Sequence, residues 1–191
     1  MSQGNERFEQ HRARLARMVQ MRLDPRLRRR VDVDDVLQEV WVEASRRLPE
    51  HERAPSMPFF LWLRLLTAQK LVELYRRHLG AEGRDVRREL HSGDGLLPRS
   101  DSTFLADRIS GHLTSPSSAA AREEMRERLR EALDRMPPAD REVLVLRHYE
   151  QLTSAEAARE LGLEPSAASK RYVRALGRLR TALAGLDDST G

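Results

Sequence analysis

The residues that most clearly suggest a chemistry are the basic side chains between positions 164 and 180. Five cations stand there against one acid, Glu164, although the net charge of the whole chain is only +4. Arginine presents a planar fork of donors that matches a phosphate group. This local excess indicates a polyanion as partner, with an ordinary solvated arginine-rich face as the alternative. The cations are Lys170, Arg171, Arg174, Arg178 and Arg180.

A second candidate group combines carboxylates with an amide, and it comprises Asp34, Asp35, Gln38 and Glu39. Paired carboxylates can bind a metal ion or act as an acid–base pair, but no third ligand stands nearby in the sequence. Charges that cap the start of a surface helix are an equally good explanation of Asp34 and Asp35. We therefore expect no metal site here and no nuclease chemistry.

Motifs of enzyme active sites are missing from the sequence. The six histidines are scattered without metal-ligand spacing, and no phosphate-binding loop or nucleophile elbow occurs. The chain has no cysteine, and hence no thiolate ligand or thiol nucleophile. No apolar run approaches the roughly 18 residues of a membrane span, and no export signal begins the chain. We expect a cytoplasmic protein that is not an enzyme, has no catalytic residue and needs no cofactor.

The hydrophobic spacing indicates helix nearly throughout and no alternating strand pattern. The predicted fold class is all-α, with two small helical domains joined by a long linker and a helix-turn-helix in the C-terminal domain. Residues 80 to 118 are rich in Gly, Ser, Asp and Pro, and a segment of this length and composition favours a linker, with short helical turns around residues 85–90 and 104–109. The predicted domains therefore cover residues 1–79 and 119–185.

Helix boundaries follow from caps and breakers. In the N-terminal domain we predict helices over residues 6–23, 32–48 and 59–79, the second capped by Asp32 or Asp34. Residues 49–58 contain three prolines and are predicted to form a loop. In the C-terminal domain, Pro137 and Pro138 end a helix that starts near residue 118, and Asp140 is predicted to cap the next helix, over 141–150.

The helix-turn-helix prediction rests on residues 152–180. Thr153 or Ser154 can cap a first short helix that ends at Leu161, and Gly162 stands where a left-handed residue would close it. Pro165 suits the first position of a second helix, because its missing N–H costs nothing there. A turn this short holds the second helix across the first, which is the layout of many DNA-binding domains.

The second helix of this motif has two different faces at 100° per residue. In a DNA-reading helix, residues near the N-terminus reach base edges and cations further along hold phosphates. The predicted base-edge residues are Ser166, Ala167, Ser169 and Lys170. The predicted phosphate contacts are Arg171, Arg174 and Arg178. The predicted buried stripe is Ala168, Tyr172, Ala175, Leu176, Leu179 and Leu183.

A helical wheel of residues 59–77 places Trp62 away from the predicted core stripe, among polar and basic residues. An aromatic ring beside cations can stack on an unpaired base. Packing of Trp62 against another N-terminal helix is the alternative, and the residue pattern leaves both open. The predicted core stripe is Leu61, Leu65, Ala68, Val72 and Tyr75.

Four runs in order resemble bacterial sigma-70-family factors. The run 33-VDDVLQEVWVEASRRL-48 resembles the helix that docks on the clamp of RNA polymerase, and 59-FFLWLRLLTAQKLVELYRR-77 resembles the adjoining promoter-melting helix. The runs 136-MPPADREVLVLRHYEQLT-153 and 154-SAEAARELGLEPSAASKRYVRALGRLR-180 resemble the domain that reads the −35 element. The order is similar to the short extracytoplasmic-function type, and 163-LEPSAASKRYVRAL-176 resembles its planctomycete branch.

The resemblance implies a function and a set of residues. It implies a sigma factor that binds core RNA polymerase and promoter DNA, with an anti-sigma or other regulatory protein as a further partner. Region 2 of the family would correspond to residues 1–79 and region 4 to residues 119–185. The implied polymerase-binding residues are Asp34, Asp35, Leu37, Gln38, Glu39 and Val40. The implied −10 residues are Trp62, Arg64, Gln69, Lys70, Arg76 and Arg77.

The sequence departs from the family pattern at three positions, and it also fits a second function. Gln69 stands where many relatives have Asn, and Leu65 and Ala68 stand where many have Arg or Lys. Fewer cations there would weaken unaided melting or shift the base preference. A helix-turn-helix also occurs in stand-alone transcriptional regulators, which normally dimerise on paired half-sites and need no core polymerase. A stand-alone regulator is therefore the alternative function.

Overall fold

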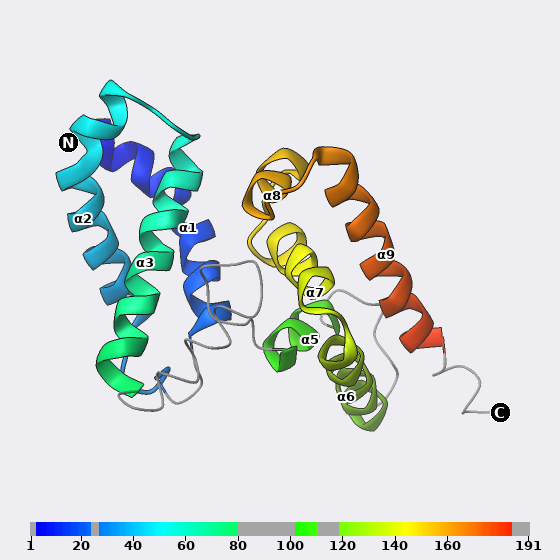
Figure 1. The fold of residues 1–191 in the computed structure, drawn as a ribbon. Coiled ribbons are helices and arrows are strands. Elements are labelled where there is room, and N and C mark those ends of the chain that lie inside the picture. Colours follow the sequence, from blue (N-terminus) through cyan, green and yellow to red (C-terminus); the bar gives the residue numbers. More distant parts are fainter. Residues whose placement is uncertain (1–2, 24–26, 80–101, 111–118, 185–191) are drawn as a thin grey trace. The chain divides into compact units, whose positions relative to one another are not determined.

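A computed structural model of the chain describes residues 3–23, 27–79, 102–110 and 119–184 (Figure 1). The described elements are all helical, which confirms the predicted all-α fold class. The chain divides into two compact units, Met1–Arg99 and Ser100–Gly191, and each is described on its own.

The N-terminal unit is a bundle of three helices, α1 (Gln3–Arg22), α2 (Val33–Arg53) and α3 (Phe59–Leu79), each of which packs against the other two (Figure 1). Its core consists largely of leucine and valine side chains that are almost fully buried. One buried tyrosine adds a hydrogen bond between two helices. The Tyr75 hydroxyl donates a hydrogen bond to the Arg22 carbonyl oxygen, which joins α3 to the end of α1. Core residues include Leu15, Val19, Leu37, Leu63 and Leu71.

The start of α2 is as predicted, but its end is not. Asp32 is the N-cap, and its carboxylate accepts a hydrogen bond of 2.7 Å from the Asp34 amide. The predicted end near residue 48 is wrong, because α2 runs through Pro49 to Arg53. Proline removes one backbone donor, yet the following turn is held by packing, since His51 is buried against α3.

The C-terminal unit contains α5 (Ser102–Ser110), α6 (Ala119–Arg135), α7 (Pro138–Leu144), the π-helical turn η1 (Val145–Tyr149), α8 (Ser154–Glu160) and α9 (Pro165–Ala184). The long helix α9 packs on α6, α7 and α8. The prediction that Asp140 caps a helix is wrong. Helix α7 begins at Pro138 with Pro137 as N-cap, and Asp140 lies buried in its first turn.

Helix α5 falls inside the range predicted as a linker and contains the helical turn predicted around residues 104–109. The other residues of that range, including a helical turn predicted near residues 85–90, lie outside the described residues. Leu105 and Ala106 are buried, and α5 packs on α6. The buried Arg141 guanidinium donates a hydrogen bond of 3.1 Å to the Ser102 hydroxyl. Arg126 of α6 lies 3.5 Å from the carboxylate of Asp107. The described part of the predicted linker is thus packed into the C-terminal unit.

Candidate nucleic-acid interface

The turn between α8 and α9 has the geometry that its sequence predicts. Thr153 caps α8 through a reciprocal pair of hydrogen bonds with Glu156, from the Glu156 amide to the Thr153 hydroxyl (3.2 Å) and from the Thr153 amide to the Glu156 carboxylate (2.8 Å). Gly162 has a φ of +61°, in the left-handed region that favours glycine. Helix α9 then begins at Pro165. Local signals therefore fix the position of α9 after α8.

Helix α9 buries a narrower stripe than the helical wheel predicts. Ala168, Ala175 and Leu179 are buried against the rest of the unit. Leu176 is 36% exposed, so its predicted burial is wrong. Two of the three buried residues are alanines. The neighbouring helices cover only the side of α9 that carries these three residues, so Leu176, at the edge of that side, is partly exposed to solvent. The side chain of Leu183 lies outside the described residues.

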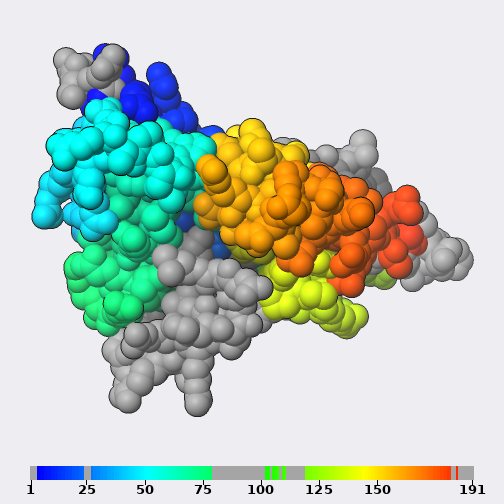
Figure 2. All heavy atoms as spheres, turned by 45° about the horizontal axis from the view of Figure 1, so that its top comes forward, coloured from blue at the N-terminus to red at the C-terminus, as the bar shows by residue number. Residues whose placement is uncertain are grey.

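The predicted base-edge residues all lie on the exposed side of α9. Figure 2 shows the surfaces of α8 and the start of α9 next to each other in orange. Small side chains here would let a helix approach the floor of a DNA groove closely. Val173, on the same side, is 66% exposed. The exposed base-edge candidates are Ser166, Ala167, Ser169 and Lys170.

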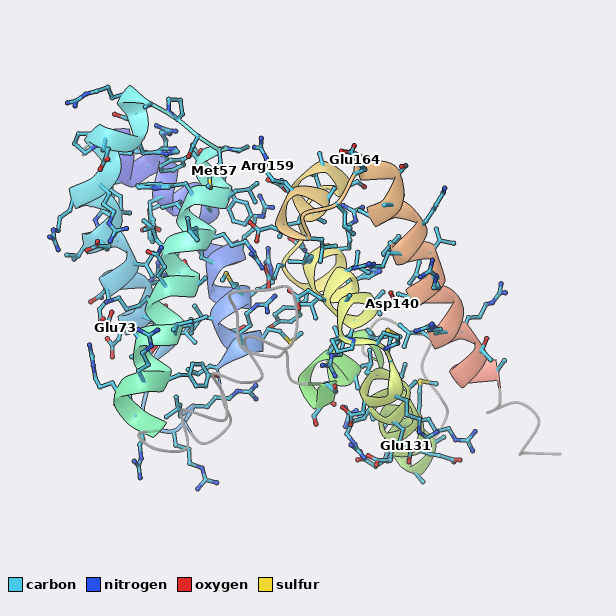
Figure 3. The ribbon with its side chains drawn as sticks, in the orientation of Figure 1. Met57, Glu73, Glu131, Asp140, Arg159 and Glu164 are labelled. Carbon is cyan, nitrogen blue, oxygen red and sulfur yellow. The ribbon has the colours of Figure 1, made fainter. Side chains whose placement is uncertain are left out.

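Four of the five cations of α9 divide into two pairs. Arg178 lies 3.0 Å from one carboxylate oxygen of Asp140, and Arg171 lies 3.9 Å from the other. Asp140 projects from α7 toward α9 (Figure 3). Lys170 and Arg174 are exposed, and within the described residues no carboxylate lies at ion-pair distance from either. Of the predicted phosphate contacts, Arg171 and Arg178 therefore pair with Asp140, whereas Arg174 is available to a phosphate.

In the N-terminal unit, Trp62 is buried. Only 8% of it is exposed, and its ring stacks on His51 with centroids 4.4 Å apart and planes 9° apart. The prediction that Trp62 lies outside the core is therefore wrong, and the alternative of packing against another helix is confirmed. The reason is that α3 contacts both α1 and α2, so its buried arc is wider than one stripe. Arg64 is also buried, with 3% exposed.

The other predicted −10 residues lie on the surface of α3. Gln69, Arg76 and Arg77 are exposed, while Lys70 is half-buried. Lys70 pairs with Glu73 at 2.8 Å and with Glu39 of α2 at 3.2 Å.

Glu73 lies at the centre of this charge network (Figure 3). It also pairs with Arg77 at 2.7 Å. The hydrogen bond with Glu73 raises the pKa of Lys70 and, reciprocally, lowers the pKa of Glu73. The predicted −10 cations Lys70 and Arg77 therefore have carboxylate partners on their own chain.

The predicted polymerase-binding residues separate into surface and core. Leu37 and Val40 are each only 1% exposed and hold α2 in the bundle. The exposed members are Asp34, Asp35, Gln38 and Glu39.

Two details of this face were not predicted. Asp34 pairs with Arg12 of α1 at 3.2 Å, which a pattern within α2 alone cannot reveal. Val42 is 60% exposed one turn beyond Gln38 and Glu39, on the same side of α2. Its place one helical turn along was the signal that could have identified it.

The described part of the chain offers neither a metal site nor a membrane span. It holds no group of three or more His, Asp or Glu side chains close enough to bind a metal ion. It also holds no helix long and apolar enough to cross a bilayer.

Comparison with known proteins identifies the class of the helix-turn-helix. Residues 126–179 match the family described as sigma-70, region 4. This range contains α7, α8 and most of α9, including Lys170, Arg171, Arg174 and Arg178. The C-terminal unit therefore carries a sigma-70 region 4 domain.

A solved structure extends the similarity along the chain. It is the structure of CnrH in complex with the cytosolic domain of CnrY, with a TM-score of 0.52 and 25% sequence identity. The match covers 95% of this chain and 88% of the CnrH chain. No curated protein matches the chain. CnrH is a sigma factor of the extracytoplasmic-function type, so both findings support the sigma-70 family and a role in transcription initiation. Sigma factors do not themselves catalyse a reaction.

Proposed function

We propose that the chain is an extracytoplasmic-function sigma factor, which acts in the cytoplasm, binds core RNA polymerase and directs it to specific promoters. The observation that carries this proposal is the region 4 match, because it falls on a helix-turn-helix whose second helix exposes basic and small residues. The similarity to CnrH over most of both chains supports extending the role to the N-terminal unit.

The C-terminal unit would read the −35 element. Helix α9 would enter the major groove with its first turns on base edges. Lys170 would contact a base, since Lys donates well to the acceptors of guanine. Arg174, one turn further along, would hold a phosphate. Both cations are exposed, and among the described residues neither has an ion pair, so both are available to DNA.

The N-terminal unit would bind polymerase through α2 and the −10 element through α3. The exposed carboxylates and amide at positions 35, 38 and 39 would contact a basic surface of the clamp, and Val42 would add an apolar contact. On α3, Gln69, Lys70, Arg76 and Arg77 would lie along the melted strand. Trp62 and Arg64 would have to leave the core to touch DNA, so their main contribution would be to hold α3 in place.

A regulatory partner is a further part of the proposal. CnrH forms a complex with the cytosolic domain of CnrY. An anti-sigma protein that covers the exposed faces of this chain would act in the same way. The planctomycete branch remains a prediction from 163-LEPSAASKRYVRAL-176.

Co-purification with bacterial core RNA polymerase tests this function. We expect the full chain to bind core polymerase in a stoichiometric complex. The double substitution Asp35→Asn with Gln38→Ala should weaken that complex about tenfold, as contacts at a polar rim do. Glu50→Gln is the matched control, because Glu50 is an exposed acid near the other end of α2 with no ion pair among the described residues.

Two results would contradict the proposal. A wild-type chain that does not bind core polymerase, but binds duplex DNA as a dimer, would identify a stand-alone regulator. An equal loss of binding with Glu50→Gln would show that the effect of the double substitution is general charge rather than this face of α2.

A further inference from the structure

We propose that Asp140 is a positioning residue that withholds Arg171 and Arg178 from DNA, so that they do not add to the contacts of the cations of α9 that remain available. The inference rests on the proposed function, because it assumes that α9 binds duplex DNA. It concerns a residue outside the helix-turn-helix, at the start of α7.

The geometry directs both oxygens of one carboxylate at α9. The Oδ2 atom of Asp140 lies 3.0 Å from Nη1 of Arg178, and Oδ1 lies 3.9 Å from Nε of Arg171. Positions 171 and 178 are two turns apart on the same side of α9, so a single acid on α7 can hold both. The side chain of Asp140 is 6% exposed, while those of Arg171 and Arg178 are 29% and 44% exposed.

Burial of the acid makes this contact harder to exchange than a surface ion pair. A carboxylate removed from water needs charged or hydrogen-bonding partners, and removing one partner is far more costly than breaking an exposed pair. Within the described residues, the ion-pair partners of the Asp140 carboxylate are these two guanidinium groups. If Arg178 turned to a DNA phosphate, the buried acid would keep only the more distant Arg171.

This arrangement favours specificity over total affinity. Each phosphate contact adds sequence-independent binding that salt weakens. By holding two arginines, Asp140 would remove such contacts. It would also fix the angle between α7 and α9. The remaining cations of α9, Lys170, Arg174 and Arg180, have no acid at ion-pair distance within the described part of the chain. We therefore expect Asp140 to raise the ratio of specific to non-specific binding.

The substitution Asp140→Asn tests the inference, because asparagine keeps the shape and one acceptor but loses the charge. The full chain, alone and saturated with core polymerase, is titrated with a duplex selected from a random pool and with a scrambled duplex, at several salt concentrations. Release of one or two arginines should steepen the slope of log K against log salt by about 0.9 for each new phosphate contact. Affinity for the scrambled duplex should rise, and discrimination should fall several-fold.

Glu164→Gln is the matched control for charge. Glu164 is an exposed acid just before α9 (Figure 3), with no ion pair among the described residues. Its neutralisation changes the net charge by the same amount but releases no cation. We expect the salt slope of this variant to equal that of the wild type. A slope as steep as that of Asp140→Asn would attribute the effect to overall charge and overturn the inference.

A second variant keeps the inference testable if Asp140→Asn does not fold. Neutralising Arg178 by Arg178→Gln should leave the salt slope unchanged, because this arginine is already held by Asp140. If Arg178 instead contacts a phosphate, the slope should become shallower by about 0.9, and the inference is wrong.

The wild-type titration separates this inference from the proposed function. If the wild-type chain fails to discriminate between the duplexes both with and without polymerase, the proposed function fails and the inference fails with it. If the wild type discriminates but folded Asp140→Asn has the same slope, only the inference fails.

Discussion

The cations predicted to hold DNA are arranged differently in the two units. On α3, Lys70 pairs with Glu39 and Glu73, and Arg77 pairs with Glu73. On α9, Lys170 and Arg174 have no such partner among the described residues. A cation without a partner can contact a phosphate at once, whereas a paired one must exchange a carboxylate for it.

This difference suggests an order of events. The C-terminal unit would bind duplex DNA with cations that are already available. In the N-terminal unit, Arg76 has no ion pair among the described residues, but Lys70 and Arg77 would need their surface ion pairs to be exchanged, and exposed pairs are weak enough to allow this. Asp140 provides the contrasting case, a buried acid that would keep its arginines. Whether a paired cation can bind DNA thus depends on how deeply its carboxylate partner is buried.

The largest expected effect concerns Trp62, a buried aromatic residue of the N-terminal unit. Trp62→Ala should lower the free energy of unfolding by about 3–5 kcal/mol, because a buried ring stacked on His51 is replaced by a cavity. Urea unfolding followed by circular dichroism measures this loss. Val42→Ala, at an exposed position, is the control and should change stability by less than about 0.5 kcal/mol. A loss below about 1 kcal/mol for Trp62→Ala would mean that the ring is available for a base after all.

The next effect separates two cations of α9. Lys170→Ala should lower discrimination between the selected and scrambled duplexes by about 1–3 kcal/mol, since a base contact is lost. Arg174→Ala should weaken binding to both duplexes and make the salt slope shallower by about one. Fluorescence anisotropy at several salt concentrations measures both quantities. Equal loss of discrimination in the two variants would refute the division of roles.

A smaller effect is expected when the paired cations of α3 are released. Glu73→Gln leaves Lys70 and Arg77 without their shared acid, so binding to single-stranded DNA should strengthen a few-fold. Stability should fall by less than about 1 kcal/mol, because the pairs are exposed. Glu50→Gln is the control of equal charge change. Unchanged single-strand affinity in Glu73→Gln would show that these cations do not meet DNA.

The smallest effect is a pH dependence of the N-terminal unit. Burial lowers the pKa of His51 below its ordinary 6.5; the nearby Arg7 cation lowers it further and Glu52 opposes. Because the folded pKa lies below the unfolded one, the unfolded chain takes up a proton first as pH falls. The resulting stability is therefore present above pH 6.5 and is lost as pH falls through the folded pKa.

This pH dependence is measured as the difference in urea midpoint between about pH 7.5 and about pH 5.5, a range in which histidine titrates. We expect a smaller difference in His51→Gln than in the wild type. Identical differences in the two proteins would mean that His51 does not contribute.

Local sequence signals predicted the helix-turn-helix, while residues whose state depends on distant partners were missed. Thr153, Gly162 and Pro165 act through their own backbone neighbourhood, so their positions could be predicted. Trp62 could not, because its burial depends on His51 of another helix. The sequence predicted Asp140 to be a helix cap, but its carboxylate forms ion pairs with two arginines that lie more than 30 positions further along the chain.

The same reason explains the partial prediction of the binding surfaces. A helical wheel correctly placed Ser166, Ala167, Ser169 and Lys170 on the outside of α9. It could not tell that Leu37 and Val40 serve the core of the N-terminal bundle, nor that Lys70 meets Glu39 of the neighbouring helix. Spacing within one helix defines its faces, and only the packed structure shows what covers each face.

Transcription by core polymerase from a library of random promoters tests the central claim most directly. With the full chain added, we predict selective initiation at promoters that share two elements at a fixed spacing. With Lys170→Ala, preference should relax at the upstream element only. Initiation that does not depend on the added chain, or selected promoters without an upstream element, would contradict the account.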